Sequence, residues 1–228
     1  MTTPSIEGPS PDIRHKAQET YSLLEQVYGL PEWRQPLPAV DELVSTILSQ
    51  NTNDVNRDRA FESLRKRFPT WDAVRDAPQA QIMDAIRVAG LANQKGPRIQ
   101  QVLRQISKER GQISLDFLHD LEPNEARSWL IRQKGVGPKT AAIVLQFSLG
   151  IPAFPVDTHV YRVSGRLGIR PEKMNVEKTH AYMEKLFDPA QYGPAHLNII
   201  RHGREICHAR KPSCERCPLS RLCDFYQI

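Results

Sequence analysis

Four cysteines near the end of the chain are the residues with the clearest capacity for chemistry. They lie within residues 207–223, with six, two and five residues between them, and the other 224 of the 228 positions contain no cysteine. Thiolates are good ligands for soft metal ions, and four on so short a segment can converge on one centre. The spacing predicts a metal-binding segment whose ligands are Cys207, Cys214, Cys217 and Cys223.

The spacing of the cysteines by itself leaves the kind of centre open. Zinc sites usually contain two close pairs, whereas only Cys214 and Cys217 form a close pair here. An iron–sulphur cluster also takes four thiolates. Disulfides belong to secreted proteins, and the start of the chain lacks the basic and apolar regions of a secretory signal. We therefore expect a metal site, with iron–sulphur and zinc as the two alternatives.

A second candidate site is the turn Gly135-Val-Gly137, which is followed by Pro138 and Lys139. Gly135 can adopt the left-handed backbone that ends a helix, and Pro138 suits the first position of the next one. Backbone N–H groups beside the positive end of a helix dipole suit a phosphate. The turn is predicted to bind phosphate through Gly135, Val136 and Gly137. An ordinary hairpin, in which the glycines only make the bend, is the alternative.

The elements that must position these residues are predicted to be helices. Apolar residues recur at helical spacing, as in residues 43–48, 82–89 and 99–106, and strand-like alternation is absent. We expect the helix before the turn to run from an N-cap at Asn124 to about Lys134. The fold class is therefore predicted to be all-α. Residues 1–12 are rich in Pro, Ser and Thr and are predicted to form a disordered tail.

Composition limits the partners. The formal net charge is +5, which is compatible with a polyanion such as DNA but does not identify one. No apolar run is long enough to span a bilayer, so no membrane association is expected. Without a targeting signal, we expect a prokaryotic cytoplasmic protein, associated with the nucleoid if DNA is its partner.

Three motifs in a fixed order resemble one known family. Gly135-Val-Gly-Pro-Lys139 resembles the helix–hairpin–helix motif of DNA repair glycosylases, and Asp157 follows Lys139 by 18 residues within Val-Asp-Thr-His. The cysteines come after His202-Gly-Arg204, and their pattern resembles a four-iron four-sulphur site. From about residue 40 to 225 the chain thus resembles the endonuclease III family.

The resemblance implies a function. It implies a bifunctional DNA glycosylase/AP lyase that removes oxidised pyrimidines, through a Schiff base on Lys139, and nicks the abasic strand by β-elimination. Asp157 would accept a proton or stabilise the sugar cation. The four cysteines would hold one [4Fe-4S] cluster. A mismatch-specific adenine or thymine glycosylase is the nearest alternative, although those relatives generally lack the hairpin lysine. A non-catalytic DNA-binding module is a third.

Further DNA contacts follow from the same resemblance. A glycosylase must extrude a nucleotide and fill the gap that it leaves. Leu91 matches one gap-filling position, with a core leucine as the alternative. For the other position, Asn51 occupies the matching place and Gln50, the residue type usual in the family, lies one residue early. Arg210 and Lys211 are the better candidates for phosphate contacts among the basic residues near the cysteines. His159 also lies in a matched motif, and its role is left open.

The expected architecture also follows the family. We expect a two-lobed fold with a helical-barrel lobe over residues 36–150, ending in the hairpin. Residues 13–35 and 151–228 would form the second lobe, which carries the cluster loop 207–223. Double-stranded DNA with damaged bases or abasic sites would lie in the cleft, between Lys139 and Asp157, and a monomer is expected.

Overall fold

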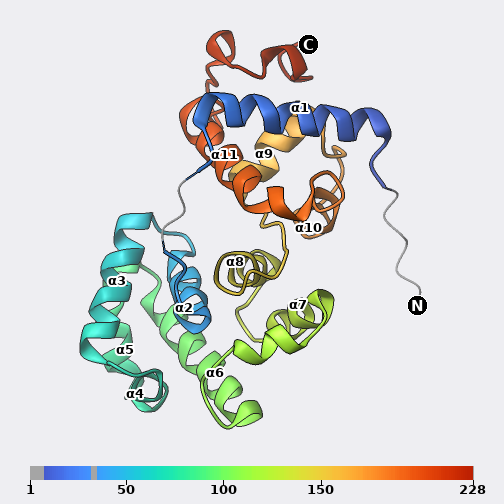
Figure 1. Ribbon diagram of the computed structural model, residues 1–228. Helices are drawn as coiled ribbons and strands as arrows, with labels where there is room; N and C mark the ends of the chain where they lie inside the picture. The colour runs from blue at the N-terminus through green and yellow to red at the C-terminus, as the bar shows by residue number, and fades with distance from the viewer. Residues whose placement is uncertain (1–7, 32–34, 228) are drawn as a thin grey trace. The chain divides into compact units, whose positions relative to one another are not determined.

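The computed structural model describes residues 8–31 and 35–227, and its regular structure over these residues is helical (Figure 1). The all-α prediction is therefore confirmed. The chain divides into two compact units: unit 1 combines Met1–Gln35 with Pro152–Ile228, and unit 2 is Pro36–Ile151. Among the described residues, no helix is both long enough and apolar enough to cross a membrane.

Unit 2 is built around α2 (Ala39–Ser49), which packs against α8, α3 and α6. Residues 42–48 of α2 are all buried, because a helix that is apolar on most sides must be surrounded by others. Leu43→Ala would therefore cost about 2–5 kcal/mol of stability. The remaining elements of unit 2 are α3 (Asp54–Arg67), α4 (Trp71–Asp76), α5 (Gln79–Ala85), η1 (Arg87–Ala89), α6 (Ala92–Arg110), η2 (Asp116–Asp120), α7 (Pro123–Ile131) and α8 (Pro138–Ser148).

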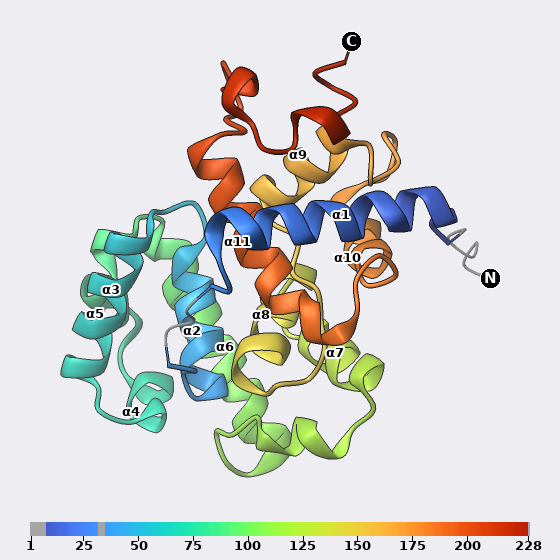
Figure 2. The same ribbon diagram turned by 45° about the horizontal axis from the view of Figure 1, so that its top comes forward.

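Unit 1 joins the first helix to the C-terminal third of the chain. In it, α11 (Tyr192–Glu205) packs against both α1 (Pro11–Tyr28) and α9 (Thr158–Leu167), as Figures 1 and 2 both show. The other elements of unit 1 are α10 (Val176–Met183), η3 (Pro189–Gln191), η4 (Cys214–Arg216) and η5 (Ser220–Leu222).

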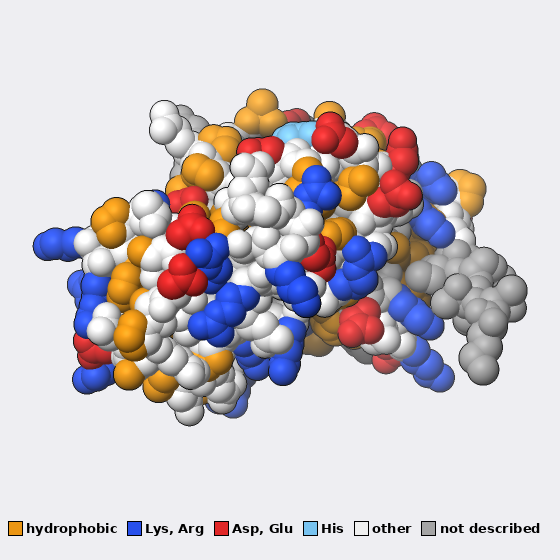
Figure 3. Space-filling view, turned by 90° about the horizontal axis from the view of Figure 1, so that it is seen from below, with side chains coloured by type: hydrophobic (Ala, Val, Ile, Leu, Met, Phe, Trp, Pro, Cys, Tyr) orange, Lys and Arg blue, Asp and Glu red, His pale blue; other side chains and the backbone are white. Residues whose placement is uncertain are grey.

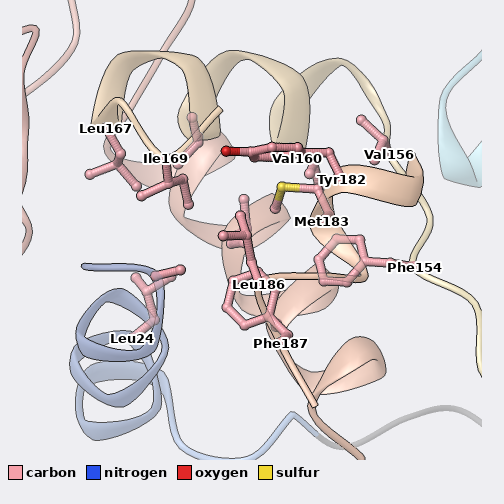
Figure 4. Packing of buried hydrophobic residues seen from close by; sticks show 14 of the residues in the cluster. Leu24, Phe154, Val156, Val160, Leu167, Ile169, Tyr182, Met183, Leu186 and Phe187 are labelled. Carbon is pink, nitrogen blue, oxygen red and sulfur yellow. The ribbon is translucent and has the colours of Figure 1, made fainter. Parts of the chain in front are cut away.

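The core of unit 1 explains why distant segments form one body. Phe154 is fully buried and stacks on Phe187, with ring centroids 5.4 Å apart. Leu24 of α1 belongs to the same cluster, with Tyr182 and Met183 of α10 (Figure 4). Burial of each such side chain contributes about 1.5–3 kcal/mol, which is enough to hold α1 onto the C-terminal segment.

Three local expectations were wrong. The predicted tail 1–12 overlaps α1, which begins at Pro11, because the Ser10 side chain accepts a hydrogen bond from the N–H of Ile13 and Pro11 suits the first helical turn. Residues 1–7 of that tail lie outside the described residues. The helix before the hairpin begins at Pro123 with Glu122, not Asn124, at its N-cap, and it ends at Ile131 instead of near Lys134. The segment 82–89 is two elements, α5 and η1, instead of one helix.

Candidate functional site

The hairpin between α7 and α8 offers backbone donors at a helix N-terminus. Gly135 has a left-handed backbone with φ of 90°, and Gly137 and Pro138 begin α8 as predicted. Within the described residues, the N–H groups of Gly135 and Gly137 have no acceptor, and no side chain caps α8. Val136 was predicted to bind phosphate with the two glycines, but its N–H is already used. It donates to the main-chain oxygen of Gln133 at 3.0 Å, and the valine side chain is buried. The turn is therefore suited to a phosphate through its two glycines and the first turn of α8.

Lys139 is the second residue of α8 and is exposed. Its ammonium makes no hydrogen bond or ion pair with the described residues. A side chain that is exposed, beside open backbone donors, is accessible to a large ligand that lies across the turn.

Two side chains from other parts of unit 2 support this turn. Arg98 of α6 donates to Oε1 of Gln50 at 3.1 Å, and Nε2 of Gln50 donates to the oxygen of Gly135 at 3.4 Å. The aliphatic stem of Arg98 lies directly against Gly135, where an added Cβ would be 3.1 Å from Cδ of the arginine. The end of α2, the start of α6 and the turn are thus held as one assembly.

Asn51 and Leu91 share an unusual backbone. Their φ angles are 53° and 51°, and among the described residues Lys211 is the only other non-glycine residue with positive φ. Leu91 is 42% exposed, which excludes the alternative of a core leucine, and Asn51 is exposed as well. A left-handed leucine is disfavoured by about 1–2 kcal/mol, so the surrounding structure must impose this conformation.

In unit 1, Asp157 is the N-cap of α9. Its Oδ1 accepts a hydrogen bond from the N–H of Val160 at 2.8 Å, while Oδ2 has no donor among the described residues. The carboxylate is half-buried. The capping bond fixes the rotamer, and the second oxygen remains available for a ligand or a proton.

Two buried histidines hold the backbone that leads to Asp157. Nδ1 of His180 lies 3.0 Å from the oxygen of Phe154, and Nδ1 of His196 lies 2.9 Å from the oxygen of Pro155. A carbonyl oxygen can only accept, so each histidine carries its proton on Nδ1. Sequence reasoning missed both residues, because their partners are 26 and 41 residues away.

The ring of His159 is hydrogen-bonded to the guanidinium of Arg162. Its Nδ1 lies 3.0 Å from Nη2 of Arg162, and a guanidinium can only donate, so Nδ1 is unprotonated. Burial lowers the pKa of His159 below 6.5, although Asp157 partly opposes this. An added Cβ on Gly203 would lie 2.9 Å from this ring. The neighbours of His159 therefore indicate a packing role.

All four cysteines line one cavity, together with Leu219, His202 and other residues of unit 1. The four are described, and none is in a disulfide. Within residues 8–31 and 35–227, no three His, Cys, Asp or Glu side chains are close enough together to hold a single metal ion. A zinc ion would need its four sulfurs within about 4 Å of one another, whereas a cluster spreads its ligands over several irons. Four thiols that line one cavity are a donor set that fits an iron–sulphur cluster.

Burial disfavours the ionised form of two of the thiols. Burial raises the pKa of Cys217 to about 11, and burial likewise raises the pKa of Cys223 above its ordinary value. Iron bound to these sulfurs would stabilise the thiolates, as it does for any coordinating thiol. His202 also lines this cavity, and its Nε2 lies 3.6 Å from Sγ of Cys217.

Helix α9 connects Asp157 to the cysteine segment. Arg166 donates through Nη1 to Sγ of Cys207 at 3.3 Å and to the oxygen of His208 at 2.7 Å. One turn earlier, Arg162 donates through Nε to the oxygen of Cys207 at 3.0 Å. Neither arginine stands out in the sequence, since arginines at this spacing on a helix are common on solvated faces.

Basic residues of the cysteine segment differ in what they contact. Arg210 and Lys211 are exposed and make no hydrogen bond or ion pair with the described residues. Arg216 instead donates to the oxygen of Glu205 at 3.4 Å. Elsewhere the surface mixes both signs: on the face in Figure 3, Lys and Arg side chains are interspersed with Asp and Glu. Charge density alone therefore does not locate a DNA-binding surface.

Comparison with known proteins gives the family. Residues 44–189 match the family described as HhH-GPD superfamily base excision DNA repair protein, and residues 207–223 match the iron-sulfur binding domain of endonuclease III. Endonuclease III of Thermotoga maritima is 35% identical over 185 residues, which cover 81% of this chain and 82% of that protein.

A protein of Arabidopsis thaliana that bears the name of a DNA glycosylase is 37% identical over 172 residues. These residues are 75% of this chain but only 59% of the plant protein. A solved structure of a non-covalent endonuclease III–DNA complex superposes with a TM-score of 0.81 at 25% identity, over 94% of this chain and 96% of that one. The chain therefore belongs to the HhH-GPD superfamily of base excision DNA repair proteins, and within it to the endonuclease III-like members with an iron–sulfur binding domain.

Proposed function

We propose that this endonuclease III-like DNA glycosylase is bifunctional: it removes oxidised pyrimidines and then nicks the abasic strand as an AP lyase. The observation that carries the proposal is Lys139, an exposed amine in the first turn of α8, beside a turn with open backbone donors. The turn supplies a place for a DNA phosphate, and Lys139 lies two residues beyond its last glycine, Gly137.

The chemistry assigned to Lys139 is nucleophilic. Its neutral Nζ attacks C1′ of the damaged nucleotide, the N-glycosidic bond breaks, and the base leaves with a proton. The bond from C1′ to the ring oxygen O4′ then breaks, O4′ takes up a proton, and C1′ and Nζ are left as an iminium. The iminium acidifies the C2′ proton; loss of that proton breaks the bond from C3′ to its phosphate oxygen and so cuts the strand. Water then releases the lysine.

Asp157 is assigned to proton transfer and charge stabilisation. Its Oδ1 is engaged by the N–H of Val160, and Oδ2 is the oxygen available to accept the proton of Lys139 or to face the sugar cation. Lys139 lies in unit 2 and Asp157 in unit 1, so their meeting on one nucleotide is part of the proposal.

Asn51 and Leu91 are proposed as the gap-filling residues, which occupy the space that the extruded nucleotide leaves. Both are exposed and both have a left-handed backbone. Gln50, the alternative to Asn51, has both ends of its amide engaged by Gly135 and Arg98. This engagement supports Asn51.

The cysteines are proposed to hold one [4Fe-4S] cluster, whose role when bound is to fasten the cysteine segment to α9 and to hold Arg210 and Lys211 toward DNA phosphates. Purified protein should contain about four irons and about four inorganic sulphides per chain. Stoichiometric zinc without sulphide would contradict the cluster and leave the lyase proposal standing.

The alternative within the family is a mismatch-specific adenine or thymine glycosylase. The departure at Gln50-Asn51 is the feature that favours it. Lys139 favours the lyase, since an amine nucleophile is needed only for the second reaction. A monomer in a prokaryotic cytoplasm, acting on double-stranded DNA with damaged bases or abasic sites, remains our prediction.

Borohydride trapping tests the proposal. DNA with thymine glycol or an abasic site is incubated with the protein and borohydride, which reduces an iminium to a stable amine. We expect a covalent adduct that Lys139→Gln abolishes and Asp157→Asn slows. Lys108→Gln, at an exposed lysine near the end of α6, is the matched control. If the wild-type protein gives no adduct but excises a mismatched base, the alternative is correct.

A further inference from the structure

Lys95, in the first turn of α6, is a buried lysine that has no carboxylate partner among the residues that the structure describes. It is 1% exposed and lies four residues before Ile99, on the face of α6 that enters the core. Burial lowers its pKa below the ordinary value of 10.5. A charge is costly to bury, so a lysine here needs a structural reason.

Its ammonium is hydrogen-bonded to two main-chain oxygens. Nζ donates to the oxygen of Leu48 at 2.8 Å and to that of Ala89 at 2.7 Å. Leu48 is next to the last residue of α2, and Ala89 is the last residue of η1. Terminal helix oxygens lack a partner in their own helix, and the negative end of a helix favours a cation. Within the described residues Lys95 is the only donor to either oxygen.

The two oxygens lie just before the two gap-filling residues. Asn51 is three residues beyond Leu48, and Leu91 is two residues beyond Ala89. Each of the two short segments, 48–51 and 89–91, ends in a residue with a left-handed backbone, with φ of 53° at Asn51 and 51° at Leu91. A single ammonium therefore joins the bases of both loops, although the loops are far apart in the sequence.

We propose that Lys95 is a positioning residue that fixes the separation of Asn51 and Leu91, so that both can enter the gap in duplex DNA together. The inference rests on the gap-filling role proposed above. A methionine would fill the same volume but would leave both terminal oxygens without a donor, so the two loops would move independently. Preorganisation of this kind matters because a shift of about 1 Å in a binding element can lower a rate by about a hundredfold.

The test compares duplex with single-stranded DNA. Only a duplex leaves a gap to be filled, so we measure borohydride trapping rates on one abasic strand, alone and annealed to its complement. Lys95→Met should lower the ratio of duplex to single-strand rates by at least about tenfold. An equal loss on both substrates would mean a general structural contact and would overturn the proposal, as would an unchanged ratio. Lys95→Gln keeps an N–H donor, so its ratio of duplex to single-strand rates should lie between those of the wild type and Lys95→Met. This variant replaces Lys95→Met if the methionine variant does not fold.

Two further measurements complete the design. In a variant that already carries Asn51→Ala and Leu91→Ala, Lys95→Met should lower the ratio no further, because the residues through which it acts are gone. A continued fall would overturn the proposal. The fluorescence of 2-aminopurine opposite a stable abasic analogue reports gap filling without any chemistry. Lys95→Met should reduce its change on binding, and this readout holds even if the wild-type protein forms no adduct and the lyase proposal fails.

Discussion

The side-chain amide of Gln50 donates to the main-chain oxygen of Gly135 at 3.4 Å, so the end of α2 and the turn between α7 and α8 support one another. The same amide accepts from Arg98 at 3.1 Å. A residue held at both ends is poorly suited to leave its place and enter DNA. In our proposal the gap-filling role therefore stays at the matching family position, which is Asn51 here, and does not pass to the glutamine one residue earlier.

This assignment predicts that two neighbouring substitutions act differently. Asn51→Ala should lower the trapping rate on duplex DNA by about tenfold and leave single-stranded DNA much less affected. Gln50→Ala should lower both rates by a similar factor, because it loosens the turn that holds the backbone. The two substrates, each assayed with both variants, separate the roles; a duplex-specific loss in Gln50→Ala would return the gap-filling role to Gln50.

Gly135→Ala is expected to impair both stability and DNA binding. An alanine at φ of 90° is strained, and its Cβ would press on Cδ of Arg98 at 3.1 Å, so the free energy of unfolding should fall by about 1 kcal/mol. The affinity for duplex DNA should fall as well, because the N–H groups of the turn would shift.

Gly111→Ala is the matched control for this change. Gly111 has φ of 74° at the end of α6, with open space where a Cβ would lie. It should lose similar stability and keep its affinity for DNA. Equal loss of affinity in both variants, measured by fluorescence anisotropy, would show that Gly135 acts through stability alone.

Arg210 and Lys211 are expected to contact phosphates. Replacing either by Ala should weaken binding to any DNA sequence and reduce the slope of log affinity against log salt by about one. Arg216→Ala should change the slope less, since its guanidinium is already bonded to the oxygen of Glu205. An unchanged slope in Arg210→Ala, with iron lost from the protein, would assign that arginine to the cluster.

Stability should depend on pH through His159. Burial lowers its pKa in the folded state, so the unfolded chain takes up the proton first. The stability that the neutral ring contributes is present above pH 6.5 and is lost as the pH falls toward the folded pKa. The difference in unfolding free energy between wild type and His159→Gln should therefore shrink between about pH 7 and about pH 5. A difference that grows over this range would mean that the folded protein holds the ring protonated.

Much of the candidate site could be predicted from the sequence where its cause is local. Gly135 and Pro138 follow from the backbone preferences of those residues, and Asp157 caps α9 through a bond to an N–H only three residues away. The predicted N-cap at Asn124 was wrong, and its cause is also local. Pro123 is itself the first helical residue, so the N-cap is Glu122.

The remaining contacts depended on tertiary packing. The sequence determined that the chain is helical, that its four cysteines form one group and that Lys139 lies in the first turn of a helix, because each depends on spacing along the chain. Only the tertiary structure decided that Lys95 joins Leu48 to Ala89, that Gln50 is bound to Gly135 and that Arg166 donates to Cys207. Such bonds form where the packing of apolar helix faces brings distant backbone groups together, and no local pattern of residue types specifies which groups will meet.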